Sequence, residues 1–122
     1  MAKSNFKSWY AYQKAFELSM QIFKLSFKFP KEEKYSLTDQ IRRSSRSVCA
    51  NLAEGYAKKS YPKHFIAKLT DAAGENYETQ TWLEFAMRSG YITPEVHLRL
   101  TVESEEVGKL LSYMQSNSSN FK

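Results

Sequence analysis

The chain has 122 residues, of which 42% are hydrophobic, a net charge of +5 and a single cysteine, Cys49. This length predicts one domain over residues 1–122. One cysteine excludes an internal disulfide and favours a reducing compartment, so we expect a cytoplasmic protein without a secretory signal. No stretch approaches the roughly 18 uninterrupted apolar residues of a transmembrane helix, and we expect no membrane partner.

Helical periodicity and boundary residues predict four helices, at about residues 6–29, 36–57, 61–89 and 94–116, followed by a polar tail over 117–122. Pro30, Pro62 and Pro94 mark boundaries, because the residue before a proline leaves the helical region and proline itself suits a first turn. Gly90 is placed to end the third helix. Short connections favour antiparallel neighbours. We therefore predict an all-α, antiparallel up-down-up-down four-helix bundle.

The first predicted helix carries two apolar stripes, whereas a helix on the surface of a bundle needs one. The first stripe is mainly aliphatic and consists of Ala15, Leu18, Ile22, Leu25 and Phe29. The second is mainly aromatic and consists of Trp9, Tyr12, Phe16, Met20, Phe23 and Phe27. If one stripe faces the core, the other is available to a partner. We expect a homo-oligomer assembled through the aromatic stripe; the alternative is a central helix whose two stripes are both covered within the chain.

The second predicted helix combines an apolar ridge with an arginine-rich face. Arg42 and Arg46 are four residues apart and Arg43 lies beside them, which suits contacts to phosphate groups. A separate polar line predicts a hydrogen-bonded network with a carboxylate of the third helix: Gln40, Ser47, Asn51, Glu54 and Glu78. In the alternative interpretation, Glu54 or Glu78 pairs with the arginines and holds helices or subunits in register.

No residue pattern predicts catalysis, a metal or a cofactor. His64 and His97 lack the spacing of metal ligands, and Cys49 stands between small apolar residues, as a packed side chain does. Three acidic residues of the third helix share a face, but dimetal sites in bundles also use Glu-x-x-His, which the sequence lacks. We expect a protein that is not an enzyme and has no small-molecule substrate.

Charge is distributed unevenly along the chain. Residues 1–70 hold 14 Lys and Arg against 5 Asp and Glu, a balance of +9, while residues 71–122 hold 4 against 8, a balance of −4. The basic half favours a nucleic-acid partner, contacted by the arginines and by Lys58, Lys59 and Lys63. Pairing of the two halves, within or between subunits, is the alternative. Four tyrosines near helix ends either stack on bases or close the core: Tyr10, Tyr35, Tyr56 and Tyr61.

Several motifs resemble a known family. The longest are FPKEEKYSLTDQIRRS over residues 29–44 and ANLAEG over residues 50–55, joined by FKSW at 6–9, Gly74, Glu78 and SGYI at 89–92. Together they resemble the proteins encoded in intervening sequences of 23S rRNA genes, over roughly residues 5–112. The third helix departs from this pattern, because Glu75-Asn76-Tyr77 follows Gly74 where small and apolar residues are expected.

The resemblance implies a four-helix bundle that assembles as a homopentameric barrel. It extends to the accessory protein of diversity-generating retroelements, a basic barrel that binds nucleic acid and a reverse transcriptase. It also implies that the three arginines of the second helix and the three lysines named above contact nucleic acid. We therefore predict an oligomer that binds nucleic acid, with RNA the first expectation. The alternative is a scaffold or accessory subunit for a nucleic-acid enzyme such as a reverse transcriptase.

Overall fold

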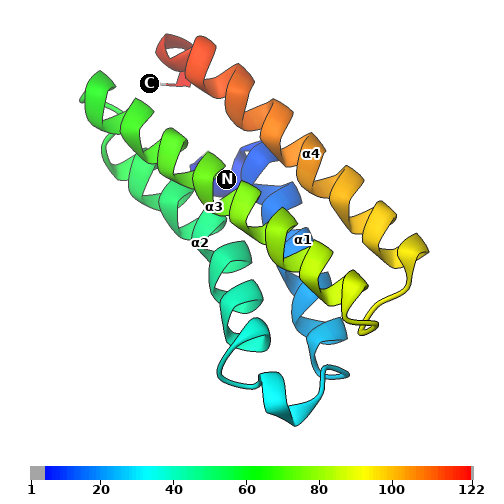
Figure 1. Cartoon of the computed structure of the whole chain (residues 1–122). Helices are drawn as coiled ribbons and strands as arrows, with labels where there is room; N and C mark the ends of the chain where they lie inside the picture. The colour runs from blue at the N-terminus through cyan, green and yellow to red at the C-terminus, as the bar shows by residue number, and fades with distance from the viewer. Residues whose placement is uncertain (1–4, 122) are drawn as a thin grey trace.

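The computed structural model describes residues 5–121; residues 1–4 and 122, which the predicted domain includes, lie outside the described residues. Four helices make up most of the chain: α1 (Tyr10–Ser26), α2 (Leu37–Ala57), α3 (Pro62–Arg88) and α4 (Pro94–Ser116) (Figure 1). Three short 3-10 helices accompany them: η1 (Phe6–Ser8), η2 (Lys31–Glu33) and η3 (Ser118–Phe121). No strand occurs between residues 5 and 121. The prediction of an all-α four-helix bundle is confirmed.

The first helix is shorter at both ends than the predicted 6–29. Asn5 caps the separate turn η1 by accepting a hydrogen bond from the Lys7 N–H (2.8 Å), and Trp9 is then extended, with φ −70° and ψ 132°. The helix ends at Ser26, and the N–H groups of the next three residues reach carbonyls only two or three positions back. This tighter turn brings the chain to Pro30, which disfavours helix in the residue before it.

The connection from α3 to α4 follows from its sequence. Gly90 has a φ of 81°, in the left-handed region that glycine adopts without strain. The Tyr91 N–H then bonds back to the Ala86 carbonyl (2.8 Å), which closes the end of α3 in a Schellman motif. Thr93 caps α4 by accepting a hydrogen bond from the Val96 N–H (3.2 Å). The start of α3 differs, because its N-cap is Tyr61, whose side chain makes no capping hydrogen bond.

The C-terminal residues pack on the bundle. The predicted polar tail instead forms η3, and the ring centroid of Phe121 lies 6.0 Å from that of Trp9 and 6.3 Å from that of Tyr113. The serines and asparagines of this segment do not predict that it packs on the bundle. The packing depends on Phe121, the one aromatic residue of the segment.

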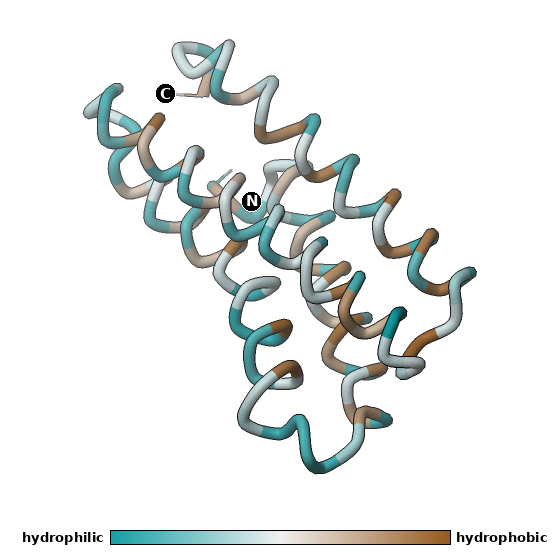
Figure 2. The backbone as a smooth tube through the Cα atoms, viewed as in Figure 1, coloured by the Kyte–Doolittle hydropathy of each residue, from teal (hydrophilic) through white to brown (hydrophobic). Residues whose placement is uncertain are grey.

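Each helix packs against the next, and α1 also packs against α4, so the four helices surround one core. Consecutive helices are joined at alternating ends (Figure 1). One end, here called the Trp9 end, brings Trp9 against Tyr56, Phe65 and Phe121. The other, the Tyr91 end, includes the α1–α2 connection, which Figure 2 shows as hydrophilic. There the Tyr91 hydroxyl donates to Glu33 Oε2 (2.9 Å), which joins the two connections of this end.

The core consists of two hydrophobic clusters. The cluster at the Trp9 end includes Leu52 and Phe65, and the cluster at the Tyr91 end includes Ile41 and Leu83. All four side chains are at most 1% exposed. Burial of such apolar surface is the main force that holds the helices together.

A layer of buried polar side chains separates the two clusters. Asn76 of α3 and Ser104 of α4 form two hydrogen bonds: Asn76 Nδ2 donates to the Ser104 carbonyl and Ser104 Oγ donates to Asn76 Oδ1, both at 2.9 Å. On the other side of α3, the Thr79 and Ser44 hydroxyls lie 2.9 Å apart. Because buried polar groups are stable only when paired, this layer favours one axial register of α2, α3 and α4.

Candidate nucleic-acid interface

The two apolar stripes of α1 lie in different environments. The aliphatic stripe is buried in the core at Ala15, Leu18 and Ile22. The aromatic stripe lies on the surface toward α2, with Phe16 48% exposed and Phe27 68% exposed. Residues 5–121 therefore cover one stripe and leave much of the other open to solvent.

Trp9 is an exception to the aromatic stripe. Its ring packs within the chain, 5.8 Å from Tyr56 and 6.0 Å from Phe65 and Phe121 between ring centroids. Because Trp9 is extended and precedes α1, its side chain does not follow the helical stripe. The surface part of the predicted interface is therefore Tyr12, Phe16, Met20, Phe23 and Phe27, of which Tyr12 and Phe23 are half-buried.

Two of the predicted arginines lie on these aromatic rings. The guanidinium carbon of Arg42 is 4.9 Å from the ring centroids of both Phe23 and Phe27, and that of Arg46 is 5.1 Å from Phe23. Arg42 Nε also donates to Ser26 Oγ at 2.7 Å, which holds the side chain across the α1–α2 seam. Stacking of a cation on an aromatic face is favourable and fixes the guanidinium plane. We call this surface the arginine–aromatic face: Phe16, Met20, Phe23, Phe27, Arg42 and Arg46.

The structure thus merges two sites that the sequence suggested separately. The predicted phosphate contacts Arg42 and Arg46 and the predicted oligomer contacts Phe23 and Phe27 are parts of one surface. Arginine, methionine and aromatic residues are the types enriched at the centres of protein–protein interfaces. A subunit seated on the rings would also cover the arginines, so one partner occupies this face at a time.

Arg43 lies apart from this surface. It is exposed on α2 toward α3, where its charge acts on Glu75. Burial, followed by repulsion from Glu78, raises the pKa of Glu75, and Arg43 opposes the shift. Arg43 therefore belongs to the acidic α2–α3 side of the molecule.

Of the five residues of the predicted polar network, Asn51 and Ser47 contact each other and the other three have different surroundings. Asn51 Nδ2 donates to the Ser47 carbonyl of its own helix (2.9 Å), and Glu54 pairs with Lys68 of α3 (3.1 Å). Glu78 accepts a hydrogen bond from Trp82 Nε1 (3.2 Å), and Gln40 lines a cleft of about 380 Å³ between α2 and α3. The arginine partners expected for Glu54 and Glu78 are thus replaced by a lysine and an indole. The polar groups that tie helices together are instead those of the buried layer, which sequence reasoning missed.

The Trp9 end is the basic end of the bundle. Residues 5–16, 55–70 and 107–121 meet there or run toward it, and these segments hold seven lysines and no Asp or Glu. The corresponding segments of the Tyr91 end, residues 24–36 and 84–96, hold five Lys and Arg against four Asp and Glu. The topology therefore concentrates positive charge at one end, where the predicted Lys58, Lys59 and Lys63 lie.

Most lysines of the Trp9 end are available to a ligand. Lys14 pairs with Glu106 (2.7 Å) and Lys68 with Glu54, both through carboxylates just outside the three segments. The other five have no carboxylate within 4.0 Å among the described residues. We call the four that lie in η1 and around the α2–α3 connection the lysine cluster, which leaves out Lys109 of α4: Lys7, Lys58, Lys59 and Lys63. Lys59 Nζ lies 4.2 Å from the Tyr56 ring centroid. Lys7 was missed in the sequence because η1 is far in the chain from residues 58–63.

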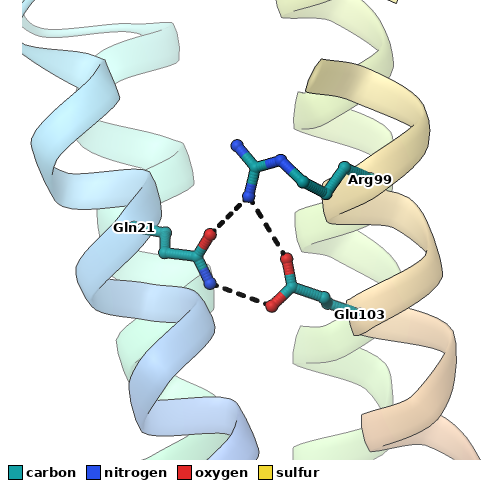
Figure 3. A network of polar contacts seen from close by, with 3 residues as sticks. All are labelled: Gln21, Arg99 and Glu103. Carbon is teal, nitrogen blue, oxygen red and sulfur yellow. Dashed lines mark hydrogen bonds and ion pairs between the residues drawn. The ribbon is translucent and has the colours of Figure 1, made fainter. Parts of the chain in front are cut away.

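The α1–α4 seam is closed by polar contacts. Gln21 of α1 lies between Arg99 and Glu103 of α4: Arg99 Nη1 donates to Gln21 Oε1 (2.6 Å), and Gln21 Nε2 donates to Glu103 Oε1 (2.9 Å) (Figure 3). Arg99 and Glu103 also pair with each other at 3.5 Å. These charges are satisfied within the chain, in contrast to Arg42 and Arg46 on the other side of α1.

The single cysteine and the possible metal ligands were considered in the sequence and can be located in the structure. Burial raises the pKa of Cys49 to about 11, so the thiol stays protonated and unreactive near neutral pH. Residues 5–121 contain no group of three His, Cys, Asp or Glu arranged to hold a metal ion. Within the same range, no helix has the length and hydrophobicity needed to span a membrane.

Comparison with known proteins identifies the family. The sequence profile of the 23S rRNA-intervening sequence protein family matches residues 7–113. The chain belongs to this family. A crystal structure of a protein of unknown function from the S23 ribosomal protein family of Bacteroides thetaiotaomicron is 33% identical. It matches with a TM-score of 0.78 over 87% of this chain and 95% of that chain. No protein with a curated description matches closely enough to add a function.

Membership of the 23S rRNA-intervening sequence protein family confirms the resemblance seen in the motifs, and the matched range includes α1, α2, α3 and all of α4 except its last turn. The solved relative supports the bundle fold. Because that relative has no known function, the role of this family member has to be argued from its own surfaces.

Proposed function

We propose that the chain is a non-enzymatic homo-oligomer that binds nucleic acid, with RNA as its first expected ligand. The observation that carries this proposal is the lysine cluster at the Trp9 end, whose four members have no carboxylate partner among the described residues. A single free thiol suits a reducing compartment, and we place the protein in the cytoplasm on that ground.

In this proposal, the lysines of the Trp9 end bind the phosphates of the nucleic acid. Lys7, Lys58 and Lys63 are exposed and Lys59 is half-buried, so their ammonium groups can reach a nucleic-acid backbone. Binding releases counterions from the polyanion, and its affinity falls steeply with salt. Assembly adds to this effect, because each subunit contributes an identical cluster.

In this proposal, subunits associate through the arginine–aromatic face. Arg42 and Arg46 have no carboxylate partner within residues 5–121, while the same chain offers acidic side chains along α3 at Asp71, Glu75 and Glu78. We propose that the face of one copy meets the acidic α3 side of the next. Such head-to-tail contacts form a ring when the rotation between successive subunits closes. Five subunits is the number that the family resemblance implies.

The nucleic-acid proposal is tested by neutralising the cluster. We expect Lys58→Gln, Lys59→Gln and Lys63→Gln together to weaken binding of a fluorescent RNA at 100 mM salt by at least tenfold. For a single strand, the slope of log affinity against log salt should also fall by about 2, if each lysine neutralises one phosphate. The matched control replaces Lys28, Lys31 and Lys34 at the Tyr91 end and should change affinity little. Equal losses in both variants would show that only net charge matters.

A second candidate function is an accessory subunit for a nucleic-acid enzyme such as a reverse transcriptase. It is favoured by the same arginine–aromatic face if its occupant is another protein rather than a second copy. A purified chain that stays monomeric at micromolar concentration, yet binds a polymerase after nuclease treatment, would support this alternative over self-assembly.

A further inference from the structure

Tyr61 is an exposed aromatic residue of the lysine-rich α2–α3 connection. It is the N-cap residue of α3, between Lys58 and Lys59 on one side and Lys63 on the other, and it is 63% exposed. Its backbone is fixed on both sides: the Tyr61 N–H donates to the Lys58 carbonyl (2.8 Å), and the Tyr61 carbonyl accepts from the Phe65 N–H (2.9 Å). The ring is therefore presented from a rigid turn.

The ring of Tyr61 is not used by the core. The centroid of the exposed His64 ring lies 6.1 Å away, edge to face, and supports one edge of Tyr61. Tyr56, one helical turn earlier in the chain, has the opposite role: it packs on Phe6 and Trp9 and carries Lys59 above its ring. The turn thus holds one tyrosine that closes the bundle and one whose face is available.

An exposed aromatic face among cations distinguishes between forms of nucleic acid. Lysines attract the phosphates of single strands and duplexes alike. A base can stack on a tyrosine ring only when it is unpaired or at the end of a duplex, because paired bases stack on each other. An exposed tyrosine beside lysines therefore favours single strands in a way that lysines alone do not.

We propose that Tyr61 is a stacking platform for an unpaired base and that the Trp9 end binds single-stranded nucleic acid in preference to duplex. This inference rests on the proposed nucleic-acid function and names the class of ligand. The phosphates on either side of the stacked nucleotide lie against the lysine cluster, and the ring and the charges act on the same segment of strand.

The test compares Tyr61→Ala with wild type, by fluorescence anisotropy on labelled oligouridylate, oligothymidylate and a blunt RNA duplex of equal length. We expect Tyr61→Ala to weaken both single strands by about tenfold and the duplex by less than twofold. Tyr61→Phe keeps the ring and should bind as wild type. The control is Tyr35→Ala at the Tyr91 end, where the tyrosine is 86% exposed beside Lys34. It should have no effect.

Each other outcome overturns the inference. If Tyr61→Ala binds single strands as wild type while the triple lysine variant loses affinity, the proposed function stands and the platform is wrong. If Tyr61→Ala loses affinity for only one of the two single strands, stacking is contradicted, because a stacked ring does not distinguish ribose from deoxyribose. If wild-type protein binds none of the three ligands, the proposed function itself fails. Unchanged thermal melting of Tyr61→Ala, expected for an exposed side chain, shows that any loss is not due to unfolding.

Discussion

Arg42 lies over the ring of Phe27, with 4.9 Å between its guanidinium carbon and the ring centroid, although Phe27 itself is 68% exposed. The pair joins the end of α1 to the first half of α2 and leaves the outer side of the ring open. An exposed phenylalanine held in place by an arginine is preorganised for a partner, because little side-chain entropy remains to be lost on binding.

Self-association should therefore depend on the exposed part of the arginine–aromatic face. We expect Phe16→Glu combined with Phe27→Ser to shift the protein from oligomer to monomer, because the change removes apolar contact area and adds a charge to the interface. Static light scattering at micromolar concentration measures the mass, and circular dichroism should show unchanged helix content. Tyr35→Ser, which removes a more exposed ring at the Tyr91 end, is the control. An oligomer that survives the double change would exclude this face as the interface.

The buried polar layer should contribute strongly to stability. Asn76→Ala removes both hydrogen bonds to Ser104 and leaves the buried Ser104 hydroxyl with only the bond that it accepts from Gln80 Nε2 (3.0 Å), so we expect the free energy of unfolding to fall by about 2–4 kcal/mol. Urea denaturation measures this change. Ser104→Ala and the double variant complete a double-mutant cycle, in which we expect a coupling energy of about 1 kcal/mol or more. Additive losses would mean that the two side chains act independently.

Two helical glycines should respond in opposite directions to alanine. A Cβ at Gly55 would lie 3.3 Å from Lys68 Cβ and 3.4 Å from Phe65 Cδ1, so Gly55→Ala requires these neighbours to shift by a few tenths of an ångström. Because Lys68 Cβ is held by its own helix, we expect a loss of about 1–2 kcal/mol of stability. A Cβ at Gly74 meets no atom within 4 Å. Gly74→Ala should stabilise by about 0.5–1 kcal/mol through its helix propensity. Thermal melting of both variants checks the pair, and a stabilising Gly55→Ala would contradict the close approach of the helices.

Stability should depend on Cys49 at high pH. Burial raises the pKa of the folded thiol to about 11, above the value of about 8.5 in an unfolded chain. The thiol therefore contributes stability that is fully present below about pH 8.5 and lost as pH rises through 11. We expect the free-energy difference between wild type and Cys49→Ala to be constant from pH 6 to 8. Between about pH 8.5 and pH 11, wild type should lose up to about 3 kcal/mol of stability relative to Cys49→Ala. A difference independent of pH would mean that the thiol reaches solvent before it ionises.

The sequence predicts the four helices because their periodicity and their boundary residues agree. Gly90 and Thr93 produce the α3–α4 connection by local chemistry alone. Trp9 shows the limit of a helical stripe, since a residue that precedes the helix does not share its periodicity. Phe121 shows the limit of composition, because one aromatic side chain decides how a polar segment packs.

The candidate site was harder to predict because it depends on how helices are rotated and paired. The sequence identifies Arg42 and Phe23 as notable residues, but their stacking follows from the rotation of α1 against α2. The acid-free segments at the Trp9 end can be read from the sequence, yet only the topology brings them together. The layer formed by Asn76 and Ser104 could not be predicted from the pattern of any one helix. Its polar groups form their hydrogen bonds between two helices.

The contact between Trp9 and Phe121 places both ends of the described chain beside the lysine cluster. A purification tag attached beyond these ends would therefore be anchored near the lysine cluster, where a histidine tag adds charge and a bulky fusion blocks access. Binding measured on tagged protein would then report partly on the tag. Circular permutation offers a remedy: joining the native termini by a short linker and opening the chain near Gly90 moves the new ends, and any tag, to the far side of the bundle.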